Sequence, residues 1–190
     1  MINKIQQYAT GKNLLFAAVV FLSGYLFLNT LHHPVSILTI KQLSGGHTIL
    51  NLLPFYNAAI GYEYIESYTS EAVNIYKRVL IFDVIILIPA YVVFFILSFS
   101  YYGRKILPDK KRIISIFFIL PIIAALLNLV EDGIIRFLLE SQSYHSNKLM
   151  TIAGIITTSK LLIFAVCFFL ITVCFIISLF QKERYYQNTV

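Results

Sequence analysis

Tryptophan is absent from this chain, cysteine occurs only twice, and charged residues make up only 13% of the sequence. Soluble domains contain about a quarter charged residues, so this scarcity of charge excludes an ordinary soluble domain. The 58% hydrophobic content and the mean hydropathy of +0.79 favour a membrane protein. Cys167 and Cys174 lie seven residues apart in an apolar run, which excludes a CxxC redox pair and favours two small apolar side chains on one helix face.

Catalytic and nucleotide-binding motifs are also missing. The sequence contains no HExxH, G-x-S-x-G, P-loop or G-x-G-x-x-G motif, so it favours a non-catalytic protein without a cofactor. The formal charge of +6 does not indicate nucleic-acid binding, because the basic residues gather beside the apolar runs, where they meet lipid headgroups. The expected partners are therefore membrane lipids and other membrane proteins, and no nucleic acid.

Four apolar stretches have the roughly 20 residues that a transmembrane helix needs. They are Asn13–Leu31, Val79–Ser98, Ile113–Val130 and Leu161–Phe180. The sequence thus predicts an all-α, polytopic bundle of four transmembrane helices that forms a single membrane domain over residues 1–190. Pro121 lies inside the third span, where neighbouring helices must accommodate a kink.

Lys and Arg are distributed unevenly between the segments that connect these spans. Met1–Lys12, Tyr101–Arg112 and Gln181–Val190 hold nine basic residues in 34 positions. The intervening segments, Thr30–Arg78 and Glu131–Lys160, hold six in 79 positions. Because basic residues mark the cytoplasmic side, we expect a multi-pass protein of the cell membrane with both termini and the loop 99–112 in the cytoplasm.

The long segment 32–78 is too apolar to extend freely into water, as the stretch TILNLLPFYNAAIGY illustrates. Ser44-Gly45-Gly46 predicts a turn, Pro54 predicts a break, and Tyr62–Arg78 predicts a helix that runs straight into the second span. Apolar residues also continue beyond the third span and before the fourth, through residues 131–160. We therefore expect a partly helical extracytoplasmic cap built from 32–78 and 131–160.

The stretch LLNLVEDGIIRF places polar residues at the outer end of the third span. Asn128, Asp132 and Arg136 follow one another at i, i+4 and i+8, so they share one helix face. Asp83 lies about four residues inside the second span, roughly 6 Å deep, and Lys160 begins the fourth. The candidate site residues at this level are Asp83, Tyr91, Asn128, Glu131, Asp132, Arg136 and Lys160.

One interpretation of these residues is a structural network. Acids inside a membrane are costly unless they are paired, so pairing is the favoured explanation. Asp132 and Arg136 have the spacing of an acid–base pair along one helix, and Arg136 and Glu140 repeat that spacing. Lys160 is placed to neutralise Asp83 or Glu131 from the fourth span. In this interpretation the side chains hold helices together and perform no chemistry.

The other interpretations give the polar residues a ligand. In the leading one, the chain is a scaffold, an accessory subunit or a binder of lipid-like ligands, with an outward-facing polar network between the second, third and fourth spans. We expect an outer pocket between these same spans, beneath the long loop. A metal-assisted hydrolase at the outer leaflet is an alternative, with His47, Asp83 and Glu131 as candidate metal ligands. A second alternative is an ion-coupled carrier of small solutes that uses Asp83. No paired histidines at i,i+4 support the hydrolase, and no inverted repeat supports the carrier.

Three stretches carry a resemblance: SGGHTILNLLPFY, YIESYTSEAVNIYKRVLIFDVIILIPAYVVFF and LPIIAALLNLVEDGIIRFLL. They resemble a group of uncharacterised four-span proteins of bacteria, which implies a bacterial inner membrane and no particular activity. The matching positions are Gly45, Gly46, Asn51, Tyr76, Asp83, Tyr91, Pro121, Asn128 and Glu131. Asn51 and Asn128 stand where that group has acids, and Asp132 stands where it has asparagine. These departures weaken a mechanism with three carboxylates and favour a hydrogen-bonded network.

Overall fold

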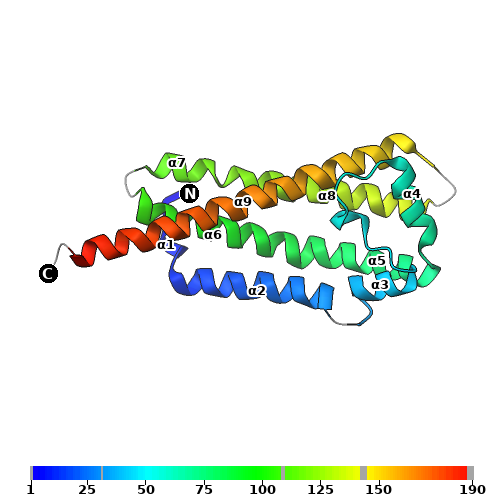
Figure 1. The fold of residues 1–190 in the computed structure, drawn as a ribbon, viewed down its shortest axis with the longest axis horizontal. Helices are drawn as coiled ribbons and strands as arrows, with labels where there is room; N and C mark the ends of the chain where they lie inside the picture. Colours follow the sequence, from blue (N-terminus) through cyan, green and yellow to red (C-terminus); the bar gives the residue numbers. More distant parts are fainter. Residues whose placement is uncertain (1, 31, 108–109, 142–144, 188–190) are drawn as a thin grey trace.

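The computed structural model describes residues 2–30, 32–107, 110–141 and 145–187, and within these ranges the regular structure is helical, without strands. Four helices in the described chain are long and apolar enough to cross a membrane (Figure 1). They are Gly11–Thr30, Ser70–Ile106, Arg112–Glu140 and Asn147–Phe180. The prediction of an all-α polytopic bundle is therefore confirmed. Leu31 of the first predicted span, positions 108–109 of the predicted loop and positions 142–144 of the predicted cap lie outside the described residues.

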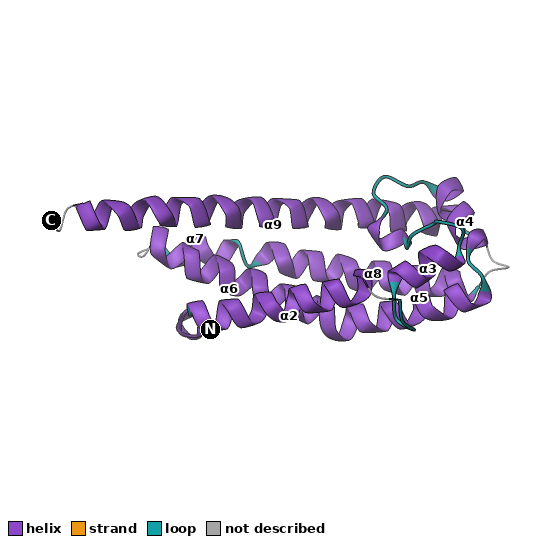
Figure 2. Cartoon of the chain, turned by 60° about the horizontal axis from the view of Figure 1, so that its bottom comes forward, coloured by secondary structure: helices purple, strands orange, loops and turns teal. Residues whose placement is uncertain are grey.

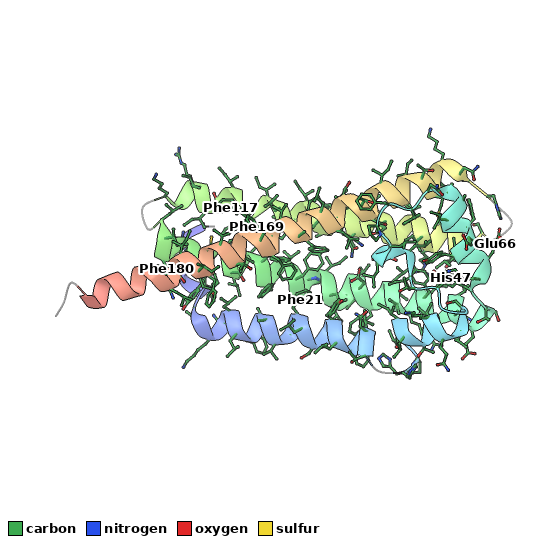
Figure 3. All side chains as sticks on the ribbon, viewed as in Figure 1. Phe21, His47, Glu66, Phe117, Phe169 and Phe180 are labelled. Carbon is green, nitrogen blue, oxygen red and sulfur yellow. The ribbon has the colours of Figure 1, made fainter. Side chains whose placement is uncertain are left out.

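The first membrane helix is α2 (Gly11–Thr30), which follows the short helix α1 (Ile2–Tyr8). It packs on α6 (Ile88–Ile106), where the ring of Phe21 stacks on that of Phe94 with centroids 5.6 Å apart (Figure 3). The remaining face of α2 exposes large apolar side chains, among them Leu15 and Phe16. An apolar surface of this extent suits contact with lipid.

The second membrane helix combines α5 (Ser70–Phe82), η2 (Asp83–Leu87) and α6 without interruption. The predicted single helix from Tyr62 into this span is wrong, because α4 (Ala58–Ser67) ends before α5 begins. Thr69 causes the break: its side chain accepts a hydrogen bond from the N–H of Ala72 and caps α5, while its own backbone is extended.

The η2 segment is a π turn, and it is located at Asp83. The N–H of Ile88 bonds to the carbonyl of Asp83, five residues earlier. Pro89 follows directly; it lacks an N–H, and its ring conflicts with the carbonyl four residues before it in a regular α-helix. A wider π turn relieves this conflict, and such turns are common at functional sites.

The third membrane helix is divided near Pro121 into α7 (Lys111–Ile116) and α8 (Ile119–Glu140). The proline occupies the first turn of α8, where its missing N–H leaves no hydrogen bond unmade. The expected kink is thus a break between two helices. α8 then continues past the predicted end of the span, as the apolar residues through Leu139 indicate.

The fourth membrane helix, α9 (Asn147–Gln187), has 41 residues and runs along the whole molecule (Figure 2). It packs against α8 and α6. Both chain termini lie at one end of the bundle, and α3 (Ile37–Leu43), η1 (Leu50–Leu52) and α4 lie at the other (Figure 1). We call these the terminal end and the cap end.

The cap is folded around the predicted turn. Gly45 and Gly46 have φ angles of +68° and +109°, which residues with a side chain rarely adopt. The N–H of Gly46 bonds to the carbonyl of Lys41 at 2.8 Å and closes α3. Beyond Pro54, the N–H of Phe55 bonds to the hydroxyl of Thr158 at 2.9 Å, so the cap is attached to α9.

Two apolar clusters fill the bundle, one toward the cap end and one toward the terminal end. The cap-end cluster joins residues of the cap to the outer turns of α5, α8 and α9, including Ile40, Tyr76 and Leu138. The terminal-end cluster is centred on Phe95 and includes Cys167, which thus serves as a small apolar side chain. Figure 3 shows Phe117, Phe169 and Phe180 toward the terminal end and His47 and Glu66 at the cap end.

Gly154 of α9 allows a close approach of the cap backbone. A Cβ atom at this position would collide with the carbonyl oxygen of Tyr56, whereas a Cβ at Gly133 on α8 would have no neighbour within 4 Å. We therefore expect Gly154→Ala to lower the thermal midpoint in detergent by the equivalent of about 1–3 kcal/mol. Gly133→Ala is the matched control and should leave the midpoint unchanged or raise it. Equal midpoints for the two variants would contradict the tight cap–α9 contact.

Candidate functional site

A layer of polar side chains crosses the bundle where the two apolar clusters meet. It is formed by α5–η2, α8, α9 and the η1 segment of the cap. We call it the buried polar cluster, and its members are Asn51, Tyr76, Asp83, Asn128, Glu131, Asp132, Thr157 and Lys160. Five of the seven predicted site residues belong to it, namely Asp83, Asn128, Glu131, Asp132 and Lys160.

The centre of the cluster is the ion pair between Lys160 of α9 and Glu131 of α8. The side chains are only 5% and 0% exposed, and the ammonium donates directly to Oε2 of Glu131. The second oxygen, Oε1, accepts the hydroxyl of Thr157, one turn before Lys160. The ammonium also donates to Oδ1 of Asn128 at 2.5 Å. Each charge therefore has partners, as a buried ion pair requires.

Asn128 connects this pair to the second membrane helix. Its Nδ2 donates to Oδ2 of Asp83, at the start of the π turn. The carboxyl groups of Asp83 and Asp132 are neighbours whose charges interact. The second, third and fourth membrane helices thus meet through one amide, one ammonium and three carboxyl groups, at the level that the sequence predicts.

The cap closes the cluster from above through Asn51. Its Nδ2 donates to Oδ1 of Asp132 at 2.8 Å, and its Oδ1 accepts the hydroxyl of Tyr76 at 2.6 Å. The oxygen of that hydroxyl accepts the N–H of Leu50 at 2.9 Å. A second phenol, Tyr68, donates to the carbonyl of Thr48 at 2.6 Å; burial raises the pKa of Tyr68, so it remains a donor.

Three buried polar atoms at or near the cluster have no hydrogen-bond partner among the described residues, and one of them is the hydroxyl of Tyr56 in the cap. The second is Oδ2 of Asp132, whose other oxygen accepts the amide N–H of Asn51. The third is the hydroxyl of Tyr91, on α6, which is 3% exposed. Buried polar groups are normally paired, so each such exception requires an explanation.

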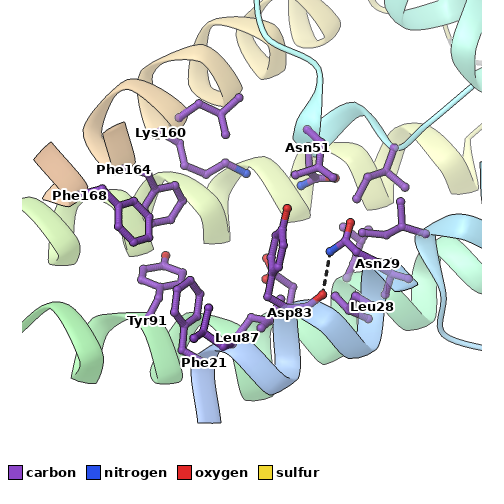
Figure 4. Close-up of a pocket in the computed structure, with 18 residues that line it drawn as sticks. Phe21, Leu28, Asn29, Asn51, Asp83, Leu87, Tyr91, Lys160, Phe164 and Phe168 are labelled. Carbon is purple, nitrogen blue, oxygen red and sulfur yellow. Dashed lines mark hydrogen bonds between the residues drawn. The ribbon is translucent and has the colours of Figure 1, made fainter. Parts of the chain in front are cut away.

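A cavity of about 380 Å³ lies beside the cluster, between α2, the α5–α6 helix and α9 (Figure 4). Its wall is mostly apolar, and its lining residues include Phe21, Tyr25, Leu28, Leu87, Phe164 and Phe168. Asp83, Tyr91 and Lys160 line the same cavity. We call it the lateral pocket, because the lining residues Leu22 and Phe168 are also half exposed at the side of the bundle.

Besides Tyr91, which lies near the cluster, two predicted residues do not join it, Arg136 and His47. Arg136 lies farther toward the cap end and pairs with Glu140, with Nε 3.3 Å from Oε1 and both side chains about half exposed. Asp132 does not pair with Arg136; its Oδ1 accepts a hydrogen bond from Asn51. His47 packs edge-on against Tyr64 in the cap, with ring centroids 4.5 Å apart. No three His, Cys, Asp or Glu side chains in the described ranges are grouped so that they could hold a metal ion.

Sequence reasoning did not assign Thr157 and Tyr76 to the site, although a signal exists for both. Thr157 precedes Lys160 by three residues, and Tyr76 precedes Asp83 by seven, so each shares a helix face with a predicted residue. Asn51 matched the resemblance but was not placed against Asp132. Only the folded cap brings these two together, because 81 residues separate them along the chain.

In comparisons with known proteins, no family, no curated protein and no solved structure matches the chain. The interpretation of the site therefore depends on its geometry.

The ion pair between Lys160 and Glu131 should dominate the stability of the bundle. Lys160→Met leaves the Glu131 carboxylate buried without its counterion, which costs about 3–5 kcal/mol. Arg136→Met is the matched control, because it breaks the half-exposed pair with Glu140, which contributes at most about 1 kcal/mol. Thermal unfolding in detergent should show the larger loss for Lys160→Met. Adding Glu131→Gln to Lys160→Met should recover part of it.

The link from Asn128 to Asp83 can be tested in the same way. Asp83→Leu and Asn128→Leu each leave cluster partners without their hydrogen bonds, so both should lower the thermal midpoint. The expected loss is about 1–3 kcal/mol for the buried Asn128, which has two partners. Leu129→Ala, a change at an exposed neighbour, is the control. Unchanged melting of both leucine variants would rule out a network that holds the helices together.

Proposed function

We propose that this chain is a non-catalytic membrane protein that binds an amphipathic, lipid-like ligand in the lateral pocket. One observation carries the proposal: an apolar cavity, placed at the side of the bundle, ends at the polar groups of Asp83, Tyr91 and Lys160. The volume of about 380 Å³ lies within the range of about 300–1,000 Å³ that is typical of small-molecule sites.

The wall of the pocket suits a hydrocarbon chain. α2 and α9 each pack on α6, and the pocket occupies the space between them. Leu22 and Phe168 stand at its rim, within the apolar surface of the molecule. A ligand that is already dissolved in the bilayer can therefore enter from the side without crossing water. Burial of its chain contributes about 25 cal/mol per Å² of apolar surface.

The polar end of the pocket is held in place by the cluster. Asp83 is fixed by Asn128, and Lys160 is fixed by Glu131. A site whose groups are positioned before binding loses less conformational entropy when the ligand arrives. The structural network and the binding site are thus two roles of the same residues.

The other candidate functions receive less support. A metal-assisted hydrolase would require His47, Asp83 and Glu131 to converge, and His47 packs on Tyr64 in the cap instead. An ion-coupled carrier would require polar groups toward the terminal end. That part of the bundle is filled by the apolar cluster around Phe95.

The proposed setting is the inner membrane of a bacterium, with both termini in the cytoplasm and the cap outside. The nine basic residues in 34 positions at the terminal end support this orientation. The location of both termini at one end of the bundle is consistent with it (Figure 1). The proposed partners are membrane lipids and other membrane proteins, and the scarcity of basic residues elsewhere argues against nucleic acid.

Filling the pocket should remove the ligand. Leu161 lines the pocket, and the adjacent Leu162 is 65% exposed outside it. We expect Leu161→Trp to weaken binding of a fluorescent fatty-acyl probe about tenfold, equivalent to about 1.4 kcal/mol. Leu162→Trp, a matched substitution on the same helix, should bind as the wild type does. Native mass spectrometry should likewise find less co-purified lipid on Leu161→Trp alone. Retention of probe and lipid by both variants would overturn the proposal.

A further inference from the structure

The charges of the buried polar cluster do not balance. Glu131 receives the Lys160 ammonium directly, so these two charges neutralise each other. Asp83 and Asp132 receive amide N–H groups from Asn128 and Asn51, which carry no charge. The cluster therefore contains two carboxyl groups, side by side, without a cation of their own. An intramembrane acid normally has a cationic partner or faces a wet cavity.

One of these two carboxyl groups faces the lateral pocket. Asp83 lines the pocket and is partly exposed to it, while Asp132 is 4% exposed and lies behind. Tyr91 is a second and independent feature of the same wall. Its hydroxyl is buried without a partner among the described residues, and it points into the space that the lining residues enclose (Figure 4). The pocket wall thus offers a ligand a carboxyl group at Asp83 and an unused phenol oxygen at Tyr91.

Aromatic rings surround this position. The rings of Tyr91 and Phe164 lie 4.8 Å apart at 88°, and they form a corner in the pocket wall. Phe21, Tyr25 and Phe168 add further rings to the lining. The face of an aromatic ring attracts a cation within about 6 Å, and this attraction is strongest where water is excluded.

We propose that the head group of the bound amphiphile is a primary ammonium. This inference rests on the proposed function and specifies its ligand. The ammonium would donate hydrogen bonds to the carboxylate of Asp83 and to the oxygen of Tyr91, while the hydrocarbon tail follows the apolar wall. The ligand thereby supplies the positive charge that the pair of Asp83 and Asp132 lacks.

An anionic head group fits this wall less well. Lys160 is the cation that it would need, and its ammonium is already bound to Glu131 and Asn128. A carboxylate or phosphate would also approach the carboxyl group of Asp83, where like charges repel. A hydroxyl head group would leave the charge of the cluster unchanged.

Matched amphiphiles with one tail length test the head group. The full-length chain, purified in a non-ionic detergent, is loaded with the fluorescent fatty-acyl probe, which is displaced by dodecylamine, dodecanol, dodecanoate or dodecyltrimethylammonium. Dodecanol has the same tail and an uncharged head group, so it measures how strongly the tail alone binds. We expect dodecylamine to half-displace the probe at a concentration about tenfold lower than dodecanol, because its hydrogen bond to Asp83 is charge-assisted. Dodecyltrimethylammonium, which has no N–H donor, should be weaker than dodecylamine.

Variants of the pocket residues test whether the preference for the amine over the alcohol arises in the lateral pocket. Asp83→Asn keeps the shape and should reduce the amine-to-alcohol ratio to about one. Tyr91→Phe, which removes an unpaired hydroxyl, should fold normally and reduce the ratio in part. Glu140→Gln is the matched control, because it removes an exposed carboxylate of α8 outside the pocket, and it should keep the wild-type ratio.

The possible outcomes distinguish a failure of the proposed head group from a failure of the proposed binding pocket. If the probe binds but dodecanol or dodecanoate displaces it as well as dodecylamine does, the proposal of an ammonium head group is wrong and the proposed function stands. If the probe does not bind to the wild type, the proposed function also fails. Lysophosphatidylethanolamine and lysophosphatidylcholine distinguish the sources of the amine. A preference for the former indicates an aminolipid, and a preference confined to dodecylamine indicates a free long-chain amine.

Discussion

The fold depends on one buried ion pair, between Lys160 and Glu131. Two charges removed from water need each other and need hydrogen bonds for their remaining oxygens and protons. This requirement sets α8 and α9 in one register, because Thr157 and Asn128 must lie at the same level as the pair. Asn128 then extends the requirement to Asp83 on the second membrane helix. Apolar contacts alone, between helices that lipid solvates equally well, would not fix these positions along the helix axes.

The polar layer also divides the interior into two parts with different tasks. Toward the terminal end, aromatic rings pack on one another around Phe95. Toward the cap end, the core includes residues of the loop that precedes the second span, and Asn51 attaches this loop to Asp132. The lateral pocket reaches the layer from the side. The ligand binding that we propose and the association of the helices therefore depend on the same hydrogen bonds, so a change at Asp83 should affect both.

Features with a short repeat along the chain could be predicted from the sequence, and features that join distant segments could not. Apolar run lengths predicted the four spans, and helical spacing placed Asn128 and Asp132 on one face. The same spacing gave Arg136 two possible partners, Asp132 and Glu140. The pair with Glu140 forms, because Arg136 lies one turn beyond Asp132 and outside the interior. The pocket was predicted between the second, third and fourth spans, but the lateral pocket lies between the first, second and fourth. Its position depends on how α2 and α9 are placed around α6, which no single helix determines.

The π turn at Asp83–Leu87 gives the second membrane helix an unusual sensitivity to its residue count. Each residue of an α-helix advances the side-chain direction by about 100°. The extra residue in the turn sets the faces of α5 and α6 separately, so that Tyr76 and Tyr91 both point inward although no uniform α-helix connects them. Deletion of a single residue here would leave composition, hydropathy and span length almost untouched. It would nevertheless rotate one half of the helix against the other, and Asp83 and Tyr91 would no longer share a wall.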